Sequence, residues 1–558
     1  MAPVGENDVV LHRFYDLART DPHAPYMTQP IGAGRVEEYT RGRTLEEARR
    51  MAAYLRSLDL PPRSHVAIVS KNCAHFVMSE LAIWMAGHVS VALYPTANAP
   101  NVRYVLEHSD SRLLFVGKLD AWEEIRNGVP ETLPCVAYPL APPTAYPTWD
   151  DIVGAHEPIA DEPRRRPDDW ALILYTSGST GQQKGVVHTF ASISAPTLGA
   201  VRTLGINHED RYLSFLPLAH AMERWAGECT SLVAGHHLYF SESLGTFIED
   251  LKRARPTLFL AVPRLWVKFQ LGVFAKIPKE RLDRLLRVPI LSRLVKRKVL
   301  GNLGLDHVRF AGSGSAPIPA ELLAWYRHLG LELLEGYGMS ENFNYSHLTR
   351  VGQGKAGFIG HPHDEVECRL SEQGEILVKS PGTMVGYYKE PQLTAEAFTS
   401  DGFLRTGDLG EIDEEGRLRI TGRLKELFKT SKGKYVAPAP IENMLNSDHH
   451  IELSCVAGAG WPATCAIVQL AEHVHDRAHE PAMQARVNEA LAALLETVNA
   501  AVPGHERLAF IAVPRDRWTI EAGLLTPTLK VRRTQVEERY GPLLEQWYAS
   551  RQRVIWEE

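Results

Sequence analysis

Short apolar runs alternate with helix-length segments in the first part of the chain, and this alternation restricts the possible folds more than any other feature. His65–Val69 and Val89–Leu93 are short runs rich in β-branched residues. Between them, apolar residues recur with helical spacing from Phe76 through Trp84. Arg112–Val116 is a further short apolar run. Strands that alternate with helices favour a mainly parallel sheet covered by helices, so we predict an α/β fold.

A similar unit returns near the middle of the chain. Ala171–Tyr175 predicts a buried strand that leads into a loop of Gly, Ser and Thr. Val308–Ala311 predicts another strand, followed by a glycine-rich loop, a helix over Ala320–Leu329 and a strand over Leu331–Leu334. Between these regions and the first strands, the Pro-rich and acidic stretch Pro139–Arg166 is typical of a surface connection.

The sequence pattern changes beyond about residue 355, from strands alternating with helices to short strands separated by turns. Gly374–Lys379 and Gly416–Thr421 are short alternating strands bounded by turn residues, and Ala482–Val498 has a helical pattern. A chain of 558 residues is also too long for one hydrophobic core. We therefore predict a large N-terminal domain of α/β layers with a β-rich subdomain, residues 1–422, and a small mobile α+β C-terminal domain, residues 423–558.

Composition and charge exclude several classes of protein. Lys and Arg number 61 against 67 Asp and Glu, and no long block of like charges interrupts the chain, which argues against a nucleic-acid partner. The first residues lack the pattern of a signal peptide, and no apolar run has the length of a membrane helix. The 6 cysteines are scattered without paired spacing, as in reduced proteins. We expect a cytoplasmic protein, and the sequence leaves its oligomeric state open.

The loop Tyr175–His188 has the composition of a phosphate-binding loop. Its glycines permit tight turns and close approach of the backbone to a ligand, and its hydroxyls and one lysine suit phosphate oxygens. It is not a Walker A loop, because the spacing of glycine, lysine and hydroxyl is wrong. The residues expected to contact phosphate are Thr176, Ser177, Gly178, Ser179, Thr180, Gly181 and Lys184.

This loop resembles the signature loop of the adenylate-forming superfamily, which includes acyl-CoA and aryl-CoA synthetases, the adenylation domains of peptide synthetases, and luciferases. Members usually carry proline before the lysine, where this chain has Gln183. That difference should alter the stiffness of the loop more than its chemistry, because proline contributes a fixed φ and no ligand.

Six further segments resemble the family in the same order. Leu216–Trp225 is similar to the form found in long-chain acyl-CoA synthetases, where the histidine matching His220 lies beside the acyl pocket. Trp225 is expected either to line the acyl tunnel or to belong to the core.

Two of these segments are identified with nucleotide binding. The resemblance implies that Gly312–Pro317 packs against adenine, and that Tyr337 offers adenine an aromatic face. Ser340 would bond the α-phosphate, and Glu341 would hold Mg²⁺ together with substrate phosphates. The residues assigned to the nucleotide from these segments are Gly314, Ser315, Ala316, Pro317, Glu335, Gly336, Tyr337, Gly338 and Ser340.

The remaining segments resemble the ribose site, the hinge and the catalytic lysine of the family. Asp408 and Arg423 would bond the ribose hydroxyls, and Lys425 matches the hinge about which the small domain rotates. Gly433 matches a glycine beside the pantetheine channel, and Lys530 matches the catalytic lysine. The resemblance covers nearly the whole chain, although motifs are weaker before residue 170.

The activity that this resemblance implies has two halves. A carboxylate attacks the α-phosphorus of ATP to give acyl-AMP and pyrophosphate, with Thr176, Lys184, His220, Glu341 and Lys530 as the catalytic group. The small domain then rotates, and a thiolate, expected to be CoA, takes the acyl group. The motifs favour a medium- or long-chain fatty acid as the carboxylic acid.

Other interpretations stay open at this stage. The alternatives are an acyl-AMP ligase that delivers to a carrier protein or an amine, and a CoA ligase for aryl or short-chain acids. A non-catalytic nucleotide-binding regulator is disfavoured by the complete set of motif residues. The basic stretch Arg281–Lys298, interrupted by Pro289, indicates a solvated helix face, peripheral contact with an anionic membrane, or contact with CoA phosphates.

Overall fold

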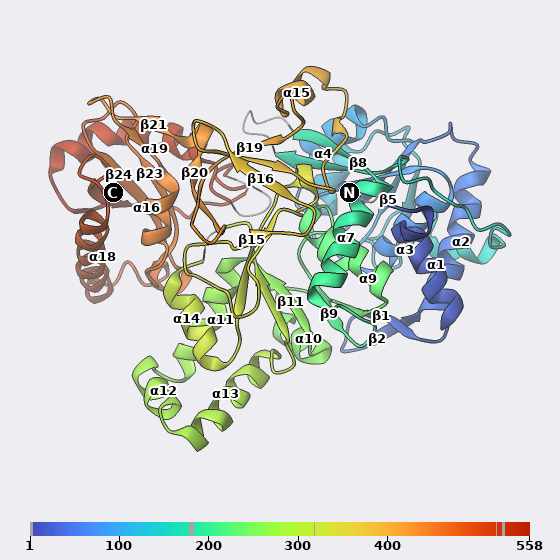
Figure 1. Cartoon of the computed structure of the whole chain (residues 1–558), viewed down its shortest axis with the longest axis horizontal. Coiled ribbons are helices and arrows are strands. Elements are labelled where there is room, and N and C mark those ends of the chain that lie inside the picture. Colours follow the sequence, from blue (N-terminus) through green and yellow to red (C-terminus); the bar gives the residue numbers. More distant parts are fainter. Residues whose placement is uncertain (1–3, 178–182, 317, 521, 527–529, 558) are drawn as a thin grey trace.

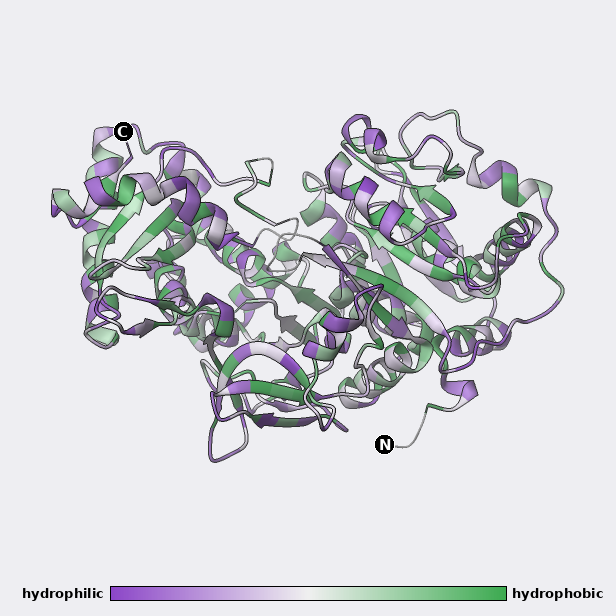
Figure 2. Ribbon diagram, turned by 90° about the horizontal axis from the view of Figure 1, so that it is seen from above, coloured by the Kyte–Doolittle hydropathy of each residue, from purple (hydrophilic) through white to green (hydrophobic). Residues whose placement is uncertain are grey.

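The computed structural model describes residues 4–557 apart from 178–182, 317, 521 and 527–529. Figure 1 shows a large N-terminal body and a smaller C-terminal lobe. Seen from above in Figure 2, the small lobe has hydrophobic strands of its own, as an independently packed domain requires. Within the described residues, no helix is both long and apolar enough to cross a lipid bilayer.

The first large sheet contains the strands expected from the opening alternation. Strands β3, β4, β5, β6 and β7 run parallel to their neighbours, and β8 closes an antiparallel hairpin with β7. Among described residues the order across the sheet is β18 (Gly386–Tyr387), β8 (Gln183–Thr189), β7 (Trp170–Ser177), β4 (Val89–Leu93), β3 (His65–Val69), β5 (Leu113–Val116) and β6 (Cys135–Ala137). The predicted bounds of β3 and β4 are confirmed.

The second large sheet is mainly parallel in its centre, with antiparallel strands at both edges. Among described residues its order is β15 (His361–Pro362), β14 (His347–Leu348), β13 (Leu333–Tyr337), β12 (Phe310–Ser313), β11 (Leu258–Ala261), β9 (Arg211–Ser214), β10 (His237–Phe240), β1 (Pro25–Pro30) and β2 (Val36–Thr40).

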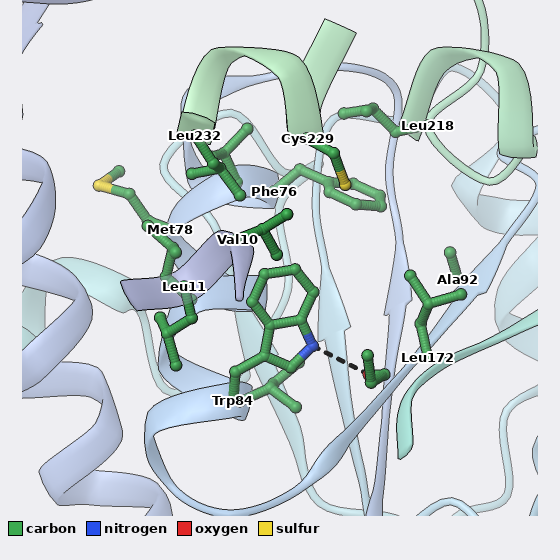
Figure 3. Packing of buried hydrophobic residues seen from close by; sticks show 14 of the residues in the cluster. Val10, Leu11, Phe76, Met78, Trp84, Ala92, Leu172, Leu218, Cys229 and Leu232 are labelled. Carbon is green, nitrogen blue, oxygen red and sulfur yellow. Dashed lines mark hydrogen bonds between the residues drawn. The ribbon is translucent and has the colours of Figure 1, made fainter. Parts of the chain in front are cut away.

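A shared core joins both sheets to the helices between them. Its helices are α1 (Val10–Thr20), α2 (Arg41–Ser57), α3 (Ala74–Met85), α7 (Phe190–Leu204) and α9 (Thr230–Ala234). Figure 3 shows part of this core, in which the indole of Trp84 on α3 packs among apolar side chains. Trp84 Nε1 donates a hydrogen bond to the carbonyl of Ala171 at 2.9 Å. Because Ala171 belongs to β7, this contact fixes the strand that leads into the predicted phosphate loop.

The stretch predicted as a surface connection, Pro139–Arg166, is more structured than its composition indicates. It contains α6 (Trp149–Ala155), which begins after Thr148, whose side chain accepts a hydrogen bond from the Asp151 amide. Trp149 is fully buried, and its ring packs edge-on against Tyr138 and His75. The expectation of a surface connection was therefore wrong for this helix, because one aromatic anchor outweighs a polar and proline-rich context.

Strands at the centre of the second sheet have two different faces. Phe259, Ala311 and Leu333 pack into a core with the helices α10 (Phe247–Ala254), α11 (Pro263–Lys276) and α14 (Ala320–Leu329). The alternate residues of the same strands point away from those helices, as the two-residue period of a strand requires. They line the cavity described below.

The helices α12 (Lys279–Leu286) and α13 (Pro289–Leu303) follow α11. They project from the large body in Figure 1. The break between the two helices falls before Pro289, as the sequence predicts, and proline takes the first position of the second helix.

A small antiparallel sheet and the C-terminal domain complete the molecule. The small sheet has the order β16 (Glu367–Leu370), β17 (Glu375–Lys379), β19 (Leu404–Ile412) and β20 (Leu418–Arg423). The C-terminal domain pairs β23 (Ile451–Ala457), β24 (Thr464–Leu470), β25 (Leu508–Val513) and β26 (Val554–Trp556). Its sheet packs between two cores that include α16 (Pro438–Leu445), α18 (Pro481–Ala501) and α19 (Arg533–Ser550). The predicted α/β fold, with a β-rich part and a small α+β domain, is confirmed.

Candidate active site

The predicted phosphate loop, Tyr175–His188, includes the paired ends of β7 and β8, and residues 178–182 between them lie outside the described residues. Thr176 pairs with Lys184 across the hairpin, and the two residues therefore frame the loop. The side chain of Ser177 and the residues Gly178, Ser179, Thr180 and Gly181 lie outside the described residues. The Lys184 ammonium lies 5.2 Å from the centre of the Tyr387 ring, within the range of a cation–π contact.

Tyr387 links this lysine to Glu341. Its hydroxyl donates a hydrogen bond to Glu341 Oε1 at 2.8 Å, and the amide of Met384 donates to the Glu341 carbonyl at 2.8 Å. Among the hydrogen bonds and ion pairs of the described residues, none uses Glu341 Oε2. The second carboxylate oxygen therefore fits the role of a hard-cation ligand that shares Mg²⁺ with phosphate oxygens. Tyr387 lies in none of the sequence motifs, so it was not predicted.

A buried histidine holds the backbone next to Glu341. Burial lowers the pKa of His188 to about 4, so the ring is neutral near pH 7. Its Nε2 lies 2.8 Å from the Ser340 carbonyl oxygen, which can only accept, and Nδ1 lies 3.0 Å from Ser192 Oγ. The ring thereby ties β8, after the phosphate loop, to the segment that carries Ser340 and Glu341. This positioning residue was also missed by the sequence analysis.

Three side chains of the predicted adenosine site form one connected group. Arg423 Nε lies 2.9 Å from Asp408 Oδ1, and the Tyr337 hydroxyl donates to Asp408 Oδ2 at 2.7 Å. The pairing of β19 with β20 places Asp408 opposite Arg423. Burial and the Asp408 carboxylate raise the pKa of the Tyr337 phenol far above its usual range, so the hydroxyl remains a donor.

The turn after β12 meets the end of β13 closely. A side chain at Gly314 would approach the Gly336 carbonyl oxygen to 3.0 Å, and one at Gly338 would come within 2.5 Å of the Asn344 backbone. Ser315 takes a left-handed backbone conformation with a φ of 69°, which presents it and exposed Ala316 at the surface of the turn. Pro317 lies outside the described residues. Gly314 therefore lets the turn after β12 approach the end of β13, and Gly338 lets the chain after β13 fold back against Asn344.

Glu335 is a buried carboxyl at the start of this segment. It is 6% exposed, and burial raises its pKa to about 7, against the effect of a hydrogen bond from the Ile318 backbone. Its carboxyl therefore fastens the loop after Gly314 to β13.

Lys530, a solvent-exposed residue of the small domain, lies near Arg423, Asp408 and His220. Desolvation there, and the neighbouring Arg423 charge, lower the pKa of Lys530, whereas Asp408 and Glu426 act in the opposite direction. Burial and the positive charge of Lys530 lower the pKa of His220 to about 4, so His220 is neutral near pH 7. His220 Nδ1 accepts a hydrogen bond from the Met222 amide at 3.1 Å, which fixes its tautomer. The structure thus brings together the predicted residues His220, Asp408, Arg423 and Lys530.

Two predicted residues lie outside this cluster. Lys425 belongs to the short helical turn Leu424–Glu426 that connects β20 to the small domain. Gly433 lies in the turn between β21 (Phe428–Lys429) and β22 (Tyr435–Val436), with a φ of 75° that favours glycine for conformational reasons alone. The roles of both residues stay predictions.

An apolar cavity adjoins the nucleotide segments. Together with the open solvent at its mouth it has an empty volume of about 610 Å³, and its surface is almost entirely carbon. Met222, Gly312, Gly336 and Tyr337 belong both to this lining and to the motifs described above. Alternate positions of three central strands contribute to the lining, namely Leu258, Leu260, Phe310, Gly312, Leu334 and Gly336 of β11, β12 and β13. Ser313 and Tyr337, at the ends of β12 and β13, and the β14 residues His347 and Leu348 also line the cavity.

The far wall of the cavity comes from α7 and from a π-helical turn, Arg224–Cys229. Trp225 is 6% exposed, lines the cavity, and packs edge-on against Tyr345 and His363, so it belongs to the core as one expectation had it. Its role in an acyl tunnel stays a prediction. Burial lowers the pKa of His347 to about 3 and that of His363 to about 4. The lining is therefore uncharged near pH 7, which suits a hydrocarbon chain.

Comparison with known proteins agrees with this geometry. Residues 14–388 match the model of the AMP-binding enzyme family, and residues 426–552 match that of the AMP-binding enzyme C-terminal domain. The chain belongs to the AMP-binding enzyme family. The resemblance to adenylate-forming enzymes stated from the motifs is confirmed.

Individual relatives are similar over most of their length. The long-chain-fatty-acid–CoA ligase FadD15 of Mycobacterium bovis is 30% identical, with 98% of each chain covered. The human long-chain-fatty-acid–CoA ligase 1 is 29% identical over 88% of this chain and 79% of its own. The adenylation domain of a carboxylate reductase from Mycobacterium chelonae superposes with a TM-score of 0.80 at 22% identity, covering 97% of this chain and 91% of that domain, and so shares the fold.

Proposed function

We propose that this protein is an AMP-forming fatty acid–CoA ligase, which joins a medium- or long-chain carboxylic acid to CoA at the expense of ATP. One observation carries the proposal: an uncharged, carbon-lined cavity shares Gly312, Gly336 and Tyr337 with the nucleotide motifs. An acyl chain in this cavity would hold its carboxylate beside the α-phosphate of ATP. The names of the Mycobacterium and human relatives support the same assignment.

In the first half-reaction, a carboxylate oxygen attacks the α-phosphorus and pyrophosphate leaves. Thr176, Ser177 and Lys184, with the loop between them, would hold the phosphates, and Ser340 would bond the α-phosphate. Lys530 would bridge the carboxylate and α-phosphate oxygens as charge builds between them. Because both reactants are anionic, fixing their relative orientation is the main task of these side chains.

Glu341 would hold Mg²⁺ through the oxygen that Tyr387 leaves available. The ion, when bound, neutralises phosphate charge. The Tyr387 hydroxyl would keep the Glu341 carboxylate oriented towards the phosphates. The ring of Tyr387 would hold the Lys184 ammonium through the cation–π contact. Tyr337, Asp408 and Arg423 would orient the adenosine, with Asp408 as acceptor for the ribose hydroxyls.

In the second half-reaction, residues 423–558 would rotate about Lys425 and withdraw Lys530. The hairpin that carries Gly433 would then face the acyl-adenylate, and the CoA thiolate would attack the acyl carbon and release AMP. The position of Lys425 between β20 and the small domain supports this hinge. All 6 cysteines are free, which agrees with a cytoplasmic enzyme.

The test is a two-stage assay with Mg-ATP and acids from acetate to oleate plus benzoates, with and without CoA, resolving AMP from ADP. We expect acid-dependent AMP and pyrophosphate, a preference for longer chains, and acyl-CoA only when CoA is present. Bound acyl-AMP that CoA does not discharge would instead identify a carrier protein or an amine as the acceptor. A preference for benzoates or acetate would reject the fatty acid. ADP release would reject adenylation.

A further inference from the structure

The helices α12 and α13 carry an unusual combination of charge and exposed apolar surface. From Lys279 to Leu303 the sequence holds eight Lys or Arg and only two acidic residues, whereas the whole chain has a formal net charge of −6. In the same segment, large apolar side chains are exposed to solvent. They are Val288 (46%), Ile290 (77%), Leu291 (43%) and Leu294 (64%).

The orientation of α13 explains why these residues are exposed together. Ser292 and Val299 are buried, and because they are seven residues apart they mark one inward face. Ile290 and Leu294 are separated by one helical turn and lie on the opposite face. Single exposed apolar residues are common, but four within seven positions form a patch that calls for an apolar partner.

Basic residues surround this patch on the same outward side. Arg293 and Arg297 are exposed and one turn apart, and Lys298 is exposed beside them. Arg287 adds a fourth cation immediately before the apolar residues. Within the described part of the chain, none of these four side chains has a recorded ion pair, although Lys279 and Asp283 do pair at 2.8 Å. The cations near the patch are therefore available to an external anion.

We infer that α12 and α13 form a docking surface for an anionic lipid bilayer. Ile290, Leu291 and Leu294 would enter the boundary between headgroups and acyl chains, and Arg287, Arg293, Arg297 and Lys298 would contact lipid phosphates. A second copy of this protein is a poorer partner for the patch, because two such surfaces would bring like charges together. Free CoA phosphates would use the cations but leave the apolar side chains without a partner.

The inference rests on the proposed function for its purpose, since long-chain acids partition into membranes and a ligase at the surface meets them there. The position of α13 in the chain also links the docking surface to the cavity. α13 leads directly into β12, whose Phe310 and Gly312 line the apolar cavity. The docked helices would therefore hold the acyl-binding sheet close to the lipid.

The experiment measures binding to sedimented vesicles without ATP, CoA or fatty acid. Vesicles of phosphatidylcholine alone are compared with vesicles that also contain phosphatidylglycerol, each at low and high salt. We expect binding to the anionic vesicles only, weakened by salt because exposed charges are screened. Combined Arg293→Gln, Arg297→Gln and Lys298→Gln substitutions should lower the partition coefficient roughly a hundredfold. Combined Ile290→Ser and Leu294→Ser should lower it at least about tenfold.

Matched variants separate this surface from general effects. Arg35, Arg486 and Arg515 are exposed cations elsewhere, and Val351 and Ile412 are exposed apolar residues elsewhere; their Gln and Ser variants should bind like the wild type. All variants should keep the wild-type rate with a water-soluble short-chain acid, which shows that they are folded.

Three results would overturn the inference. They are no binding to anionic vesicles at low salt, equal loss in the matched variants, or loss from the Gln variants with none from the Ser variants. The last result would identify a site for free anions such as CoA. Because binding is measured without substrate, an inactive protein that docks would reject the proposed function alone, and an active one that does not dock would reject this inference alone.

Discussion

Arg264 of the large domain forms an ion pair with Glu452 of the small domain. Arg264 lies in the first turn of α11, and Glu452 lies in β23, where it also contacts Arg517 at 2.8 Å. The pair therefore joins the two domains while Lys530 lies near Asp408 and Arg423. A rotation of the small domain would break it, so under the proposed function this contact would favour the arrangement for adenylation.

Arg264→Gln should slow formation of acyl-AMP about three- to fivefold, because a partly exposed ion pair contributes up to about 1 kcal/mol. Transfer of the acyl group from supplied acyl-AMP to CoA should keep its rate or become faster. Pyrophosphate release and thioester formation, measured separately, give the two rates. Lys268→Gln removes another exposed cation of α11 and serves as the control. Equal slowing of both half-reactions would contradict the assigned role.

Lys530→Ala should reduce acyl-AMP formation by at least about a thousandfold, because the lysine aligns two anionic reactants. The same variant should still form acyl-CoA from supplied acyl-AMP, since in the proposed mechanism Lys530 would move away from the reacting groups before that step. Single-turnover measurements of each half-reaction check this. Arg486→Ala, in α18 of the same domain, should leave both rates unchanged. A comparable loss in thioester formation would argue against the domain rotation.

Tyr337→Phe should raise the KM for ATP roughly tenfold, because the hydrogen bond to a charged carboxylate is lost while the aromatic face remains. Asp408 would keep its contact with Arg423, so the effect should be smaller than that of Asp408→Asn. Tyr337→Ala should be more severe than either, since it also removes the ring that meets adenine. Initial rates at varied ATP concentration give these constants, and an unchanged KM in Tyr337→Phe would show that Asp408 needs no second donor.

Ala226→Phe should narrow the cavity at the π-helical turn and shorten the chains that the enzyme accepts. Ala226 lines the cavity, so a larger side chain there occupies the space of several methylene groups. The kcat/KM for palmitate should fall at least about tenfold, since each excluded methylene forgoes about 0.8 kcal/mol of burial. The value for octanoate should change little and acts as the internal control. Parallel loss with both acids would indicate a folding defect instead.

His75 provides a test of stability against pH. It is buried, and burial lowers its pKa to about 3, so the folded protein binds its proton far less readily than the unfolded chain does. The stability that the neutral ring contributes is present above the unfolded pKa of about 6.5 and falls as the pH is lowered towards 3. As the pH is lowered between these limits, the free energy of unfolding of His75→Phe should fall by about 1 kcal/mol less per pH unit than that of the wild type.

Urea unfolding followed by circular dichroism, at pH values from neutral to moderately acidic, measures this difference. The variant and the wild type should show parallel behaviour above pH 7, where His75 is neutral in both states. His23 lies exposed at the surface, and its Phe variant should follow the wild type throughout. Identical slopes for His75→Phe and the wild type would show that the ring is protonated in the folded protein.

Local patterns predicted the strands that are buried on both sides. Val89–Leu93 was recognised because a run of apolar residues between turn signals has few alternatives. β12 was placed two residues too early, at Val308–Ala311 instead of Phe310–Ser313. Gly312 and Ser313 have low strand propensity, but β11 and β13 pair with them from both sides, and such tertiary pairing overrides propensity.

The candidate site was predicted wherever a motif is contiguous, and incompletely where distant segments meet. Asp408, Arg423 and Lys530 come from three motifs, and the structure brings them together. Tyr387 escaped notice because it lies far along the chain from both Glu341 and Lys184, and only the pairing of β18 with β8 makes the three neighbours. His188 escaped for the same reason, since its partner is a backbone carbonyl of Ser340, which leaves no signal in a side-chain pattern.

In strands β11, β12 and β13, residues that line the cavity alternate with residues that pack against the helices. Leu258 and Leu260 meet the cavity, while Phe259 between them packs against helices. Neighbouring residues on these strands therefore have different effects. One contributes to the shape of the cavity, and the next packs against the helices and stabilises the fold. Substitutions that change the cavity are therefore constrained from the other direction as well, because Leu258, Phe310 and Leu334 also belong to the core that joins the two large sheets.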